Sequence, residues 1–486
     1  MTVAVVGCAL AAVGFIGSRA VIGQKDEGEV TSAFMVKDTL YFWYTDEALT
    51  DYLNSAALEY YEETGYRIVP ALQPGLEYLE SINTASLYSE QMPDLYLTTN
   101  DTLEKAYLAG LATEVTQEGL FDDTAVFCQT AQDAVTYHDR QVGYPLYFET
   151  SILLYNQTYL MDVAKQEVQA EADTIAAEEA TQIIENAQEG ETEAALAQAE
   201  AVEATQYSEE ELEEAARQRQ SELIPGTIEE ILTFSETYDA PENVEAILKW
   251  DVSDIFYNYF FVGNYMKAGG DAGDDPAQVD LNNPQAAACM QTYQDLNQFF
   301  SIDAKEVTYD SILQEFEEGK IIFTVATTDA ISKLETAKSE GIFPYEYGVA
   351  LLPDISDSLQ TRSLSVTSAV VVNGYSEKQE VANDFAVFLT TKKAQELYAR
   401  TGKISAREGI SYENEMIERC MEEYRNSISM PKLLEISNYW VQLEIAFTQV
   451  WTGADIAEEL DALERQMMQQ LEGTAEPYDN LAGTQP

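Results

Sequence analysis

The chain of 486 residues contains a single histidine, His138, and four cysteines, Cys8, Cys128, Cys289 and Cys420. The cysteines stand far apart, without the paired spacings that zinc sites use, so the sequence does not support a metal centre. A catalytic triad would have to be built around His138, for which an ordinary loop or helix-end position is the simpler interpretation. We therefore predict neither a metal nor a cofactor, and the disulfide state of the last three cysteines stays open.

Positive charge is scarce. The chain has 26 Lys and Arg against 86 Asp and Glu, which makes the net charge -60 and the pI about 4.1. Such a chain repels nucleic acid phosphates and anionic lipid headgroups, so we exclude nucleic acid and lipid surfaces as partners. A soluble, exposed surface explains the acidity more simply than a cation-binding role does. The length predicts about two to three domains with a substantial core.

Catalytic motifs are also missing. The chain has no nucleophile elbow, no glycine-rich loop of the phosphate-binding kind and no metal-binding helix. A glycosidase would need two carboxylates across a cleft, but with 86 acidic residues such pairs arise by chance. We predict that the protein is not an enzyme, and a carboxylate-based glycosidase stays as an alternative.

The one long apolar run is "VAVVGCALAAVGFIGSRAVI", residues 3–22, which is long enough to cross a bilayer once. No Lys or Arg precedes it, because the chain begins "MTV". Two interpretations stay open: residues 1–24 form an uncleaved membrane anchor, or "VVGC" is a degenerate lipobox with Cys8 as the lipidated residue. Residues 25–37 are typical of a polar tether. Both interpretations place the rest of the chain on the extracellular face of the membrane.

From residue 38 onward, strand and helix patterns alternate. "DTLYFWYTD" and "YRIVPAL" have the β-branched and aromatic content of strands, and the segment between them has helical spacing and ends at a glycine. A further helix, a strand "PDLYLTT" and another helix follow. A helix between two strands predicts a largely parallel sheet with helices on its faces, so we predict an α/β fold.

Two segments interrupt this alternation. Residues 161–223 are rich in Ala, Glu and Gln, which predicts two antiparallel helices with a turn near Glu189–Glu191. Because apolar residues are sparse there, a solvated insertion is favoured over a partner-binding arm. The loop "GGDAGDDPAQVDLNNP" concentrates aspartates but lacks the closing glutamate of a calcium loop. We interpret it as the loop before a helix that begins at Pro284.

The stretch "GYPLYFETSILLYN", residues 143–156, resembles a buried strand but contains one carboxylate, Glu149, among tyrosines and a phenylalanine. Burying an unpaired carboxylate is costly because the ion loses its hydration. Glu149 therefore needs a partner, which is either a protein cation or a ligand.

Seven stretches occur in the order of one known family. The chain resembles the extracellular solute-binding proteins of ABC importers, in the class that includes maltose- and oligosaccharide-binding proteins. The stretches are "LYFWYTDEALTDYLNSAALEYYEETGYRIV", "MPDLYLTTNDTLEKAYLAGLATEVT", "YPLYFETSILLYNQTYL", "FEEGKIIFTVATT", "YGVALLPDI", "SLSVTSAVVVNGYSEKQEVANDFAVFLTTKKAQELYARTGKISARE" and "SNYWVQLEIAFTQVWTGADIAEELDALERQ".

The resemblance implies two α/β lobes, joined by crossing strands, that close on a ligand. It places lobe 1 at 38–147 and 349–401, lobe 2 at 148–348 and 402–475, the helical insertion at 161–223 inside lobe 2, and a disordered tail at 476–486. It also implies that the protein captures an extracellular solute, a sugar or oligosaccharide, and delivers it to the permease subunits of the importer. An anchored interaction protein that uses the acidic arm stays as an alternative.

The resemblance also implies a set of ligand-binding residues. Glu149 would face the cleft at the hinge and accept hydrogen bonds from sugar hydroxyls, although a structural salt bridge is the alternative. The full predicted set is Tyr44, Asp46, Asn100, Asp101, Tyr147, Glu149, Trp250, Asp254, Tyr257, Thr328, Asp329 and Trp440. For several of these the alternatives stay open: the core for Tyr44 and Trp440, and a helix cap for Asn100 and Asp101.

The chain departs from the family pattern at two places. Maltose-binding members have Gly-Pro-Trp where this chain has Thr327, Thr328 and Asp329, and Thr98 stands where an aromatic residue is expected. Two aromatic stacking surfaces are therefore missing. This difference argues against maltose-like oligosaccharides and leaves a smaller sugar, another polar solute or a peptide open.

Overall fold

The structure is a computed structural model that describes residues 38–117, 119–122, 124–186, 208–433 and 438–474. The predicted anchor and tether, Cys8, the turn at residues 189–191 and the tail at 476–486 lie outside the described residues. Within the described ranges, no helix has the length and apolar character needed to span a membrane.

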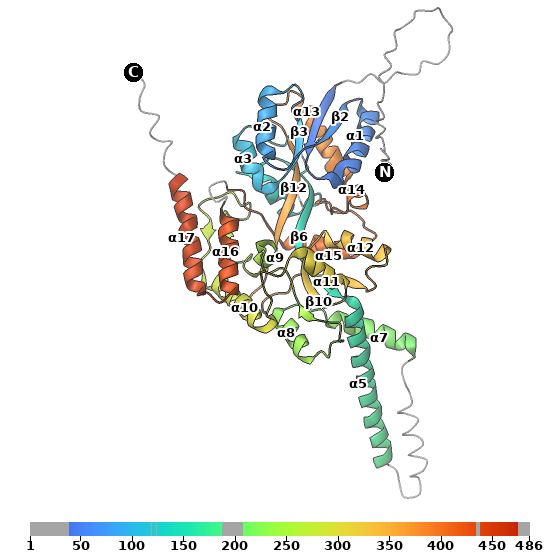
Figure 1. The fold of residues 1–486 in the computed structure, drawn as a ribbon. Coiled ribbons are helices and arrows are strands. Elements are labelled where there is room, and N and C mark those ends of the chain that lie inside the picture. Colours follow the sequence, from blue (N-terminus) through green and yellow to red (C-terminus); the bar gives the residue numbers. More distant parts are fainter. Residues whose placement is uncertain (1–37, 118, 123, 187–207, 434–437, 475–486) are drawn as a thin grey trace, which may run out of the picture.

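Lobe 1 begins with the predicted strand–helix–strand unit (Figure 1). Strand β1 (Thr39–Tyr44) pairs in parallel with β2 (Arg67–Leu72) and β3 (Leu95–Thr99). Helix α1 (Thr50–Thr64) connects β1 to β2 and ends at Gly65, whose φ of 81° a residue with a Cβ rarely adopts. Helices α2 (Tyr78–Tyr88) and α3 (Leu103–Leu108) complete the order predicted from the sequence.

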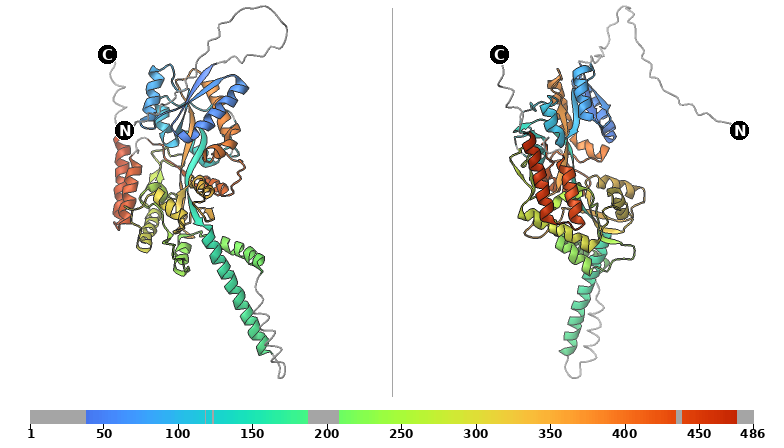
Figure 2. Two further views of the ribbon diagram at one scale, coloured as in Figure 1. Left: turned by 45° about the vertical axis from the view of Figure 1, so that its right-hand side comes forward. Right: turned by 60° about the vertical axis from the view of Figure 1, so that its left-hand side comes forward.

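Two strands cross between the lobes. Strand β6 (Tyr144–Asn156) pairs with β12 (Leu364–Val372) along its first half, and with β10 (Ile321–Thr327) and β11 (Tyr347–Ala350) along its second half. Strand β12 also pairs with β3. One sheet, in the order β2-β1-β3-β12-β6-β10-β7, therefore runs through both lobes, as the two further views show (Figure 2). The predicted two-lobed α/β fold is confirmed.

Lobe 2 surrounds the far end of this sheet, where β7 (Ala246–Leu248) is the last strand on the path. Helices α10 (Pro284–Phe300), α16 (Tyr439–Trp451) and α17 (Ile456–Thr474) pack on one another. Four elements, α5, α7, η4 and α14, are described below. The other elements of both lobes are η1 (Glu47–Leu49), η2 (Asn100–Thr102), α4 (Gln129–Val135), β4 (Thr136–Tyr137), β5 (Arg140–Gln141), α8 (Ile228–Thr237), α9 (Ile255–Asn258), η3 (Tyr259–Phe261), β8 (Lys267–Ala268), β9 (Val279–Asp280), α11 (Tyr309–Glu317), α12 (Ala330–Ser339), α13 (Gln379–Val387), α15 (Met416–Asn426) and β13 (Ile428–Ser429).

The position at which the chain returns to lobe 1 differs from the expected boundary at residue 349. Strand β11 pairs with the lobe 2 half of β6, and the Ile228 amide of α8 donates to the Asp354 carbonyl. The chain crosses back along β12. The lobe boundaries remain a prediction, and these hydrogen bonds favour a return near Leu364.

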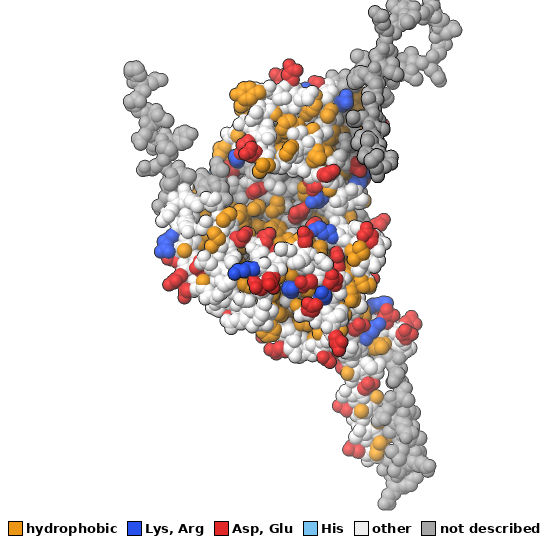
Figure 3. Space-filling view, viewed as in Figure 1, with side chains coloured by type: hydrophobic (Ala, Val, Ile, Leu, Met, Phe, Trp, Pro, Cys, Tyr) orange, Lys and Arg blue, Asp and Glu red, His pale blue; other side chains and the backbone are white. Residues whose placement is uncertain are grey.

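The acidic insertion forms helix α5 (Gln157–Glu185), which projects away from lobe 2, and helix α7 (Glu209–Glu222), which packs beside its base (Figure 1). The Arg219 guanidinium lies 2.6 Å from Glu171, and the Gln220 amide donates to the Gln157 carbonyl. These contacts fasten the C-terminal end of α7 to α5, and α7 crosses the base of α5 at an angle (Figure 1). Acidic side chains are spread over both lobes and this arm, with few basic ones among them (Figure 3).

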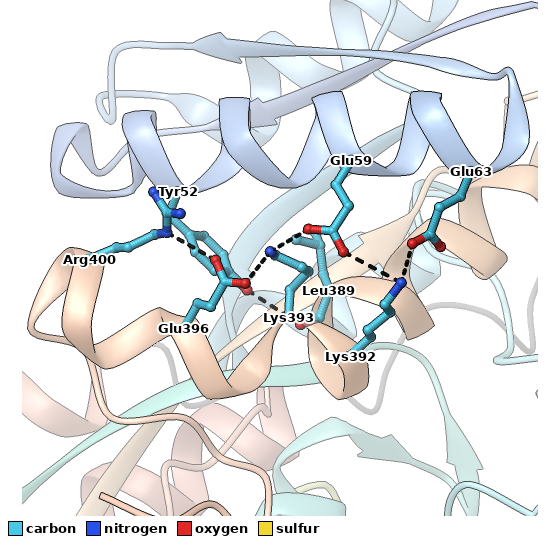
Figure 4. A network of polar contacts seen from close by, with 8 residues as sticks. All are labelled: Tyr52, Glu59, Glu63, Leu389, Lys392, Lys393, Glu396 and Arg400. Carbon is cyan, nitrogen blue, oxygen red and sulfur yellow. Dashed lines mark hydrogen bonds and ion pairs between the residues drawn. The ribbon is translucent and has the colours of Figure 1, made fainter. Parts of the chain in front are cut away.

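A network of ion pairs joins three helices within lobe 1 (Figure 4). Helix α1 supplies Glu59 and Glu63, and the segment of η4 (Phe388–Lys392) and α14 (Ala394–Thr401) supplies the partners. The Lys393 ammonium lies 2.7 Å from Glu59 and also meets Glu396, while Lys392 pairs with Glu59 and Glu63. This network fastens α1 to the helices that follow β12.

Candidate functional site at the crossing strands

Glu149 is the residue of β6 that is not buried; the other twelve residues of that strand are. Its partner is Lys403, which follows α14: the Lys403 Nζ lies 2.9 Å from Glu149 Oε1 and 3.2 Å from Asp46 Oδ2. The same nitrogen lies 5.3 Å from the centre of the Tyr147 ring. The partner that the sequence required for Glu149 is therefore a lysine of the protein, and three predicted residues meet around it.

The charges in this cluster are well defined. Burial alone would lower the pKa of Lys403, but the Glu149 carboxylate, followed by Tyr147 and Asp46, raises it well above its ordinary value. Burial raises the pKa of Tyr147, so its hydroxyl stays protonated. The Glu149 side chain is 37% exposed, and its Oε2 receives no hydrogen bond from the described residues. That oxygen can accept a hydrogen bond from outside the protein.

The residues that follow Glu149 bring lobe 2 to the same place. The Thr150 carbonyl accepts a hydrogen bond of 3.1 Å from the Thr328 amide, and the Ser151 hydroxyl donates to the Phe256 carbonyl at 3.1 Å. These bonds join the segment that ends β10 and the helix α9 to the two residues that follow Glu149 on β6. Four of the predicted residues of lobe 2, Asp254, Tyr257, Thr328 and Asp329, lie on or next to these two segments.

A second cluster with similar chemistry stands on the lobe 2 side. Tyr257 stacks on Tyr309 with ring centres 5.2 Å apart, and the Tyr309 hydroxyl donates to Asp329 at 2.8 Å. Lys333 lies 2.8 Å from the other oxygen of Asp329 and 4.7 Å from the Tyr309 ring centre. Burial raises the pKa of Asp329, but the hydrogen bonds from Lys333 and Thr327 outweigh it and lower the pKa, so this carboxylate is ionised.

Asp254 and Trp440 extend this side of the site. Asp254 caps α9, because its Oδ1 accepts from the Phe256 amide at 2.8 Å. Burial and the neighbouring Asp251 raise its pKa, and no Lys or Arg in the described part of the chain forms an ion pair with it. Trp440, in the first turn of α16, is partly buried and packs against Tyr259 at 5.6 Å. Both side chains are accessible enough to meet a solute.

Other predicted residues are enclosed by protein. Tyr44 donates its hydroxyl to Thr50, Trp250 is 1% exposed and donates to Asn258, and Thr328 is 2% exposed. The Asn100 amide group donates to Ser429 and Met430, and its oxygen accepts from the Thr367 amide. The Asp101 Oδ1 is buried and receives no hydrogen bond from the residues that the structure describes. The ligand role of these residues stays a prediction. The surroundings of Tyr44, Trp250, Thr328 and Asn100 favour a structural role.

Sequence reasoning missed Lys403, Lys333 and Tyr309. Lys403 lies in "ARTGKISARE", a stretch already matched to the family, and cations are scarce in this chain. A carboxylate in a buried strand requires a positively charged partner, so the candidate partners of Glu149 are limited to the 26 Lys and Arg residues of the chain. The sequence alone cannot select Lys403 because 253 residues separate it from Glu149.

Two cavities lie away from this cluster. One, of about 850 Å³, is lined by the base of the arm, β11 and α15, and the other, of about 860 Å³, lies between α12 and α14. None of the predicted site residues lines either cavity. Within the described ranges, no group of three or more His, Cys, Asp or Glu side chains is placed to hold a metal ion, and Cys128, Cys289 and Cys420 are buried free thiols.

Solved structures with this fold share 18% sequence identity with the chain, which shows the fold alone. An extracellular solute-binding protein from Staphylococcus aureus in complex with maltose superposes with a TM-score of 0.67 over 90% of this chain and 99% of that chain. A cyclo/maltodextrin-binding protein with maltotetraose gives 0.67, covering 92% and 99%. A maltose-binding periplasmic protein from Listeria monocytogenes with maltose gives 0.66, covering 91% and 99%.

Sequence comparison identifies the family. The galactooligosaccharide-binding protein of Bacillus subtilis (strain 168) is 24% identical over 247 residues, which are 47% of this chain and 57% of that protein. The match thus spans little more than half the length of this relative. The family described as bacterial extracellular solute-binding protein matches residues 55–419. The chain belongs to this family of bacterial extracellular solute-binding proteins.

Proposed function

We propose that the protein is the solute-binding component of an ABC importer and that it captures a saccharide between its two lobes at the crossing strands. The observation that carries the proposal is a pair of clusters with similar chemistry, one on the first half of β6 and one at the end of β10 in lobe 2. Each combines a tyrosine, a lysine and a carboxylate: Tyr147, Lys403 and Glu149 in the first, and Tyr309, Lys333 and Asp329 in the second. A polyol offers donors, acceptors and apolar ring faces, which these groups complement.

The comparisons support a saccharide as the solute. The matching relative from Bacillus subtilis is named for galactooligosaccharides, and the similar structures hold maltose or maltotetraose. Thr327–Asp329 provide a carboxylate and no aromatic ring where maltose-binding proteins have Gly-Pro-Trp. We therefore expect an oligosaccharide bound by more hydrogen bonds and less stacking than maltose is.

Binding follows from closure of the lobes. The solute hydroxyls donate to Glu149 Oε2 and Asp254, while Trp440 and the Tyr257–Tyr309 pair provide ring faces. Rotation about β6 and β12 brings both clusters onto the solute, which shifts the population toward the closed state. The solute leaves unchanged when the lobes reopen, because the proposed role is capture and not catalysis.

We further propose that residues 1–24 hold the protein at the outer face of the membrane, beside the permease subunits that receive the solute. The family is extracellular, which supports this location. Two routes of attachment are distinguishable with Cys8→Ser. This variant appears in the culture medium if a lipid on Cys8 is the anchor, and it remains in the membrane fraction if the apolar segment is.

The test of solute capture is direct. The purified protein is denatured, released solutes are identified by mass spectrometry, and galactobiose, maltotriose and smaller sugars are titrated by calorimetry. A bound saccharide raises the melting temperature by mass action and is recovered unchanged. Trp440→Ala should weaken binding about tenfold, whereas Tyr88→Ala, a matched aromatic change at an exposed residue of α2, should not. Recovery of a cleaved sugar would favour the glycosidase alternative instead.

A further inference from the structure

We propose that Lys403 sets the charge selectivity of this site: by offsetting one of the two negative charges of Glu149 and Asp46 and holding both carboxylates, it limits the attraction of the hinge end for cationic solutes and so favours an uncharged polyol. The proposal rests on the saccharide-binding function above and names the substrate class more narrowly. It assigns to Lys403 the role of a positioning residue, which acts on the solute through the two carboxylates it holds.

The first step is the way in which the cluster is assembled. Its charges come from three separate segments: Asp46 after β1, Glu149 on β6 and Lys403 after α14. Both carboxylates contact one nitrogen, so their nearest oxygens lie no more than about 6 Å apart, a range in which like charges interact strongly. Without the ammonium, two partly buried negative charges would face each other across the hinge.

The second step is that the ammonium already contacts two carboxylates. A lysine ammonium has three donors. One donates to Glu149 at 2.9 Å, the second faces Asp46 at 3.2 Å, and Tyr147 presents its ring to the same nitrogen at 5.3 Å. Lys403 is only 20% exposed. It therefore holds the two carboxylates in place, and the exposed Glu149 Oε2 is the atom left to contact the solute.

The third step concerns the charge that a solute meets. A solute amine near Glu149 meets the Lys403 ammonium, which offsets one of the two carboxylate charges, so the amine gains less attraction than two unpaired carboxylates would give it. A solute carboxylate meets one more negative than positive charge in this cluster, together with Asp254, which lacks a cation among the described residues. A solute carboxylate is therefore repelled at this end and a solute amine gains only a reduced attraction, while a hydroxyl donates to Oε2 without bringing an unpaired charge.

The experiment compares three forms of one solute: galactobiose or maltotriose, its 6-amino-6-deoxy derivative and its uronic acid counterpart. Calorimetry on the full chain gives the ratio of amine to neutral affinity. Wild type should bind the acid least and should show no strong preference for the amine over the neutral sugar. Lys403→Met removes the cation, so we expect about a tenfold loss for the neutral sugar and a shift of the ratio toward the amine by tenfold or more.

Two variants separate charge from structure. Lys403→Arg keeps the cation and should restore the wild-type ratio. Lys403→Met combined with Glu149→Gln removes one cation and one anion, so the ratio should return toward wild type even though neutral affinity stays low. Lys392→Met makes the same chemical change outside the site, where the lysine pairs with Glu59 and Glu63, and should leave the ratio unchanged.

The outcomes are distinct. If Lys403→Met lowers the affinity for all three solutes equally, the residue is merely structural and the inference is wrong. If wild type binds no saccharide, the proposed function is wrong. In that case Lys403→Met must still bind the amine more tightly than wild type does, since this attraction needs only the two unpaired carboxylates, and failure to do so overturns the inference as well.

Discussion

Two lysines, Lys393 and Lys403, each meet two carboxylates, yet their surroundings differ. Lys393 lies between helices of lobe 1, with a side chain 3% exposed, and contacts Glu59 and Glu396 (Figure 4). Lys403 lies at the crossing strands and is 20% exposed. The chemistry of the pairs is the same, so the difference in function must come from what else the carboxylates contact.

In the Lys393 network each carboxylate has a second cation. Lys392 also contacts Glu59, and Arg400 contacts Glu396 at 3.0 Å. Burial would lower the pKa of Lys393, but Glu396 and Glu59 outweigh it and raise the pKa. At the hinge, Glu149 has one cation and one oxygen without a partner among the described residues. A closed network fastens helices together, whereas a carboxylate with an accessible oxygen can receive a solute.

The largest expected effect is on folding. Lys393→Met removes the two charge-assisted hydrogen bonds that the buried ammonium donates to Glu59 and Glu396, so we expect the free energy of unfolding to fall by about 3 kcal/mol. Saccharide affinity should stay unchanged because the network lies outside the proposed site. Urea denaturation measures the first quantity and calorimetry the second. Lys392→Met, at a lysine that is half exposed, should cost less than about 1 kcal/mol. Equal losses for the two variants would show that burial does not distinguish them.

Glu423 extends the comparison to a carboxylate that forms no ion pair with any Lys or Arg in the described part of the chain. It is 5% exposed and accepts from the Ser363 hydroxyl at 2.6 Å and the Leu352 amide at 3.0 Å. Burial raises its pKa to about 7. The native state therefore keeps a proton that the unfolded chain loses near pH 4.5, and the stability contributed by Glu423 declines as pH rises from about 4.5 to about 7, by about 3 kcal/mol.

The measurement is urea unfolding of wild type and Glu423→Gln at pH 5 and pH 8. A glutamine cannot ionise, so the variant should lose less stability than wild type between these two values. Self-repulsion of the many carboxylates changes with pH in both proteins and cancels in the difference. Parallel pH dependence in the two proteins would contradict a protonated Glu423 in the native state.

Much of the fold could be predicted from the sequence because alternating strand and helix patterns are local signals. The return crossing could not be placed in this way. "YGVALLPDI" and "SLSVTSAVVV" both resemble buried strands, and pairing alone shows that β11 stays with the second half of β6 while β12 crosses to β3. Strand partners depend on contacts between distant residues, which a single sequence does not encode in its periodicity.

The site was only partly predictable, because its residues also meet through contacts between distant parts of the chain. Glu149 was identifiable because a carboxylate inside a buried strand is anomalous. Trp250 matched an aromatic family segment equally well, yet its ring packs against Trp451 at 5.6 Å in the core of lobe 2. Residue type and position cannot distinguish an aromatic side chain that faces a solute from one that faces another helix, because in either case an apolar ring becomes buried against its neighbour.

The smallest expected effect concerns the arm, whose cation Arg219 pairs with solvent-exposed carboxylates. Arg219 lies 2.6 Å from Glu171 and 3.6 Å from Glu222, but both glutamates are more than half exposed. Solvent screens these pairs, so Arg219→Gln should lower the free energy of unfolding by less than about 1 kcal/mol. Raising NaCl from 0.05 to 0.5 M, about a threefold shorter Debye length, should shrink this loss while leaving that of Lys393→Met largely intact. A loss for Arg219→Gln as large and as salt-resistant as that of Lys393→Met would mean that solvent exposure does not rank the cations of this protein.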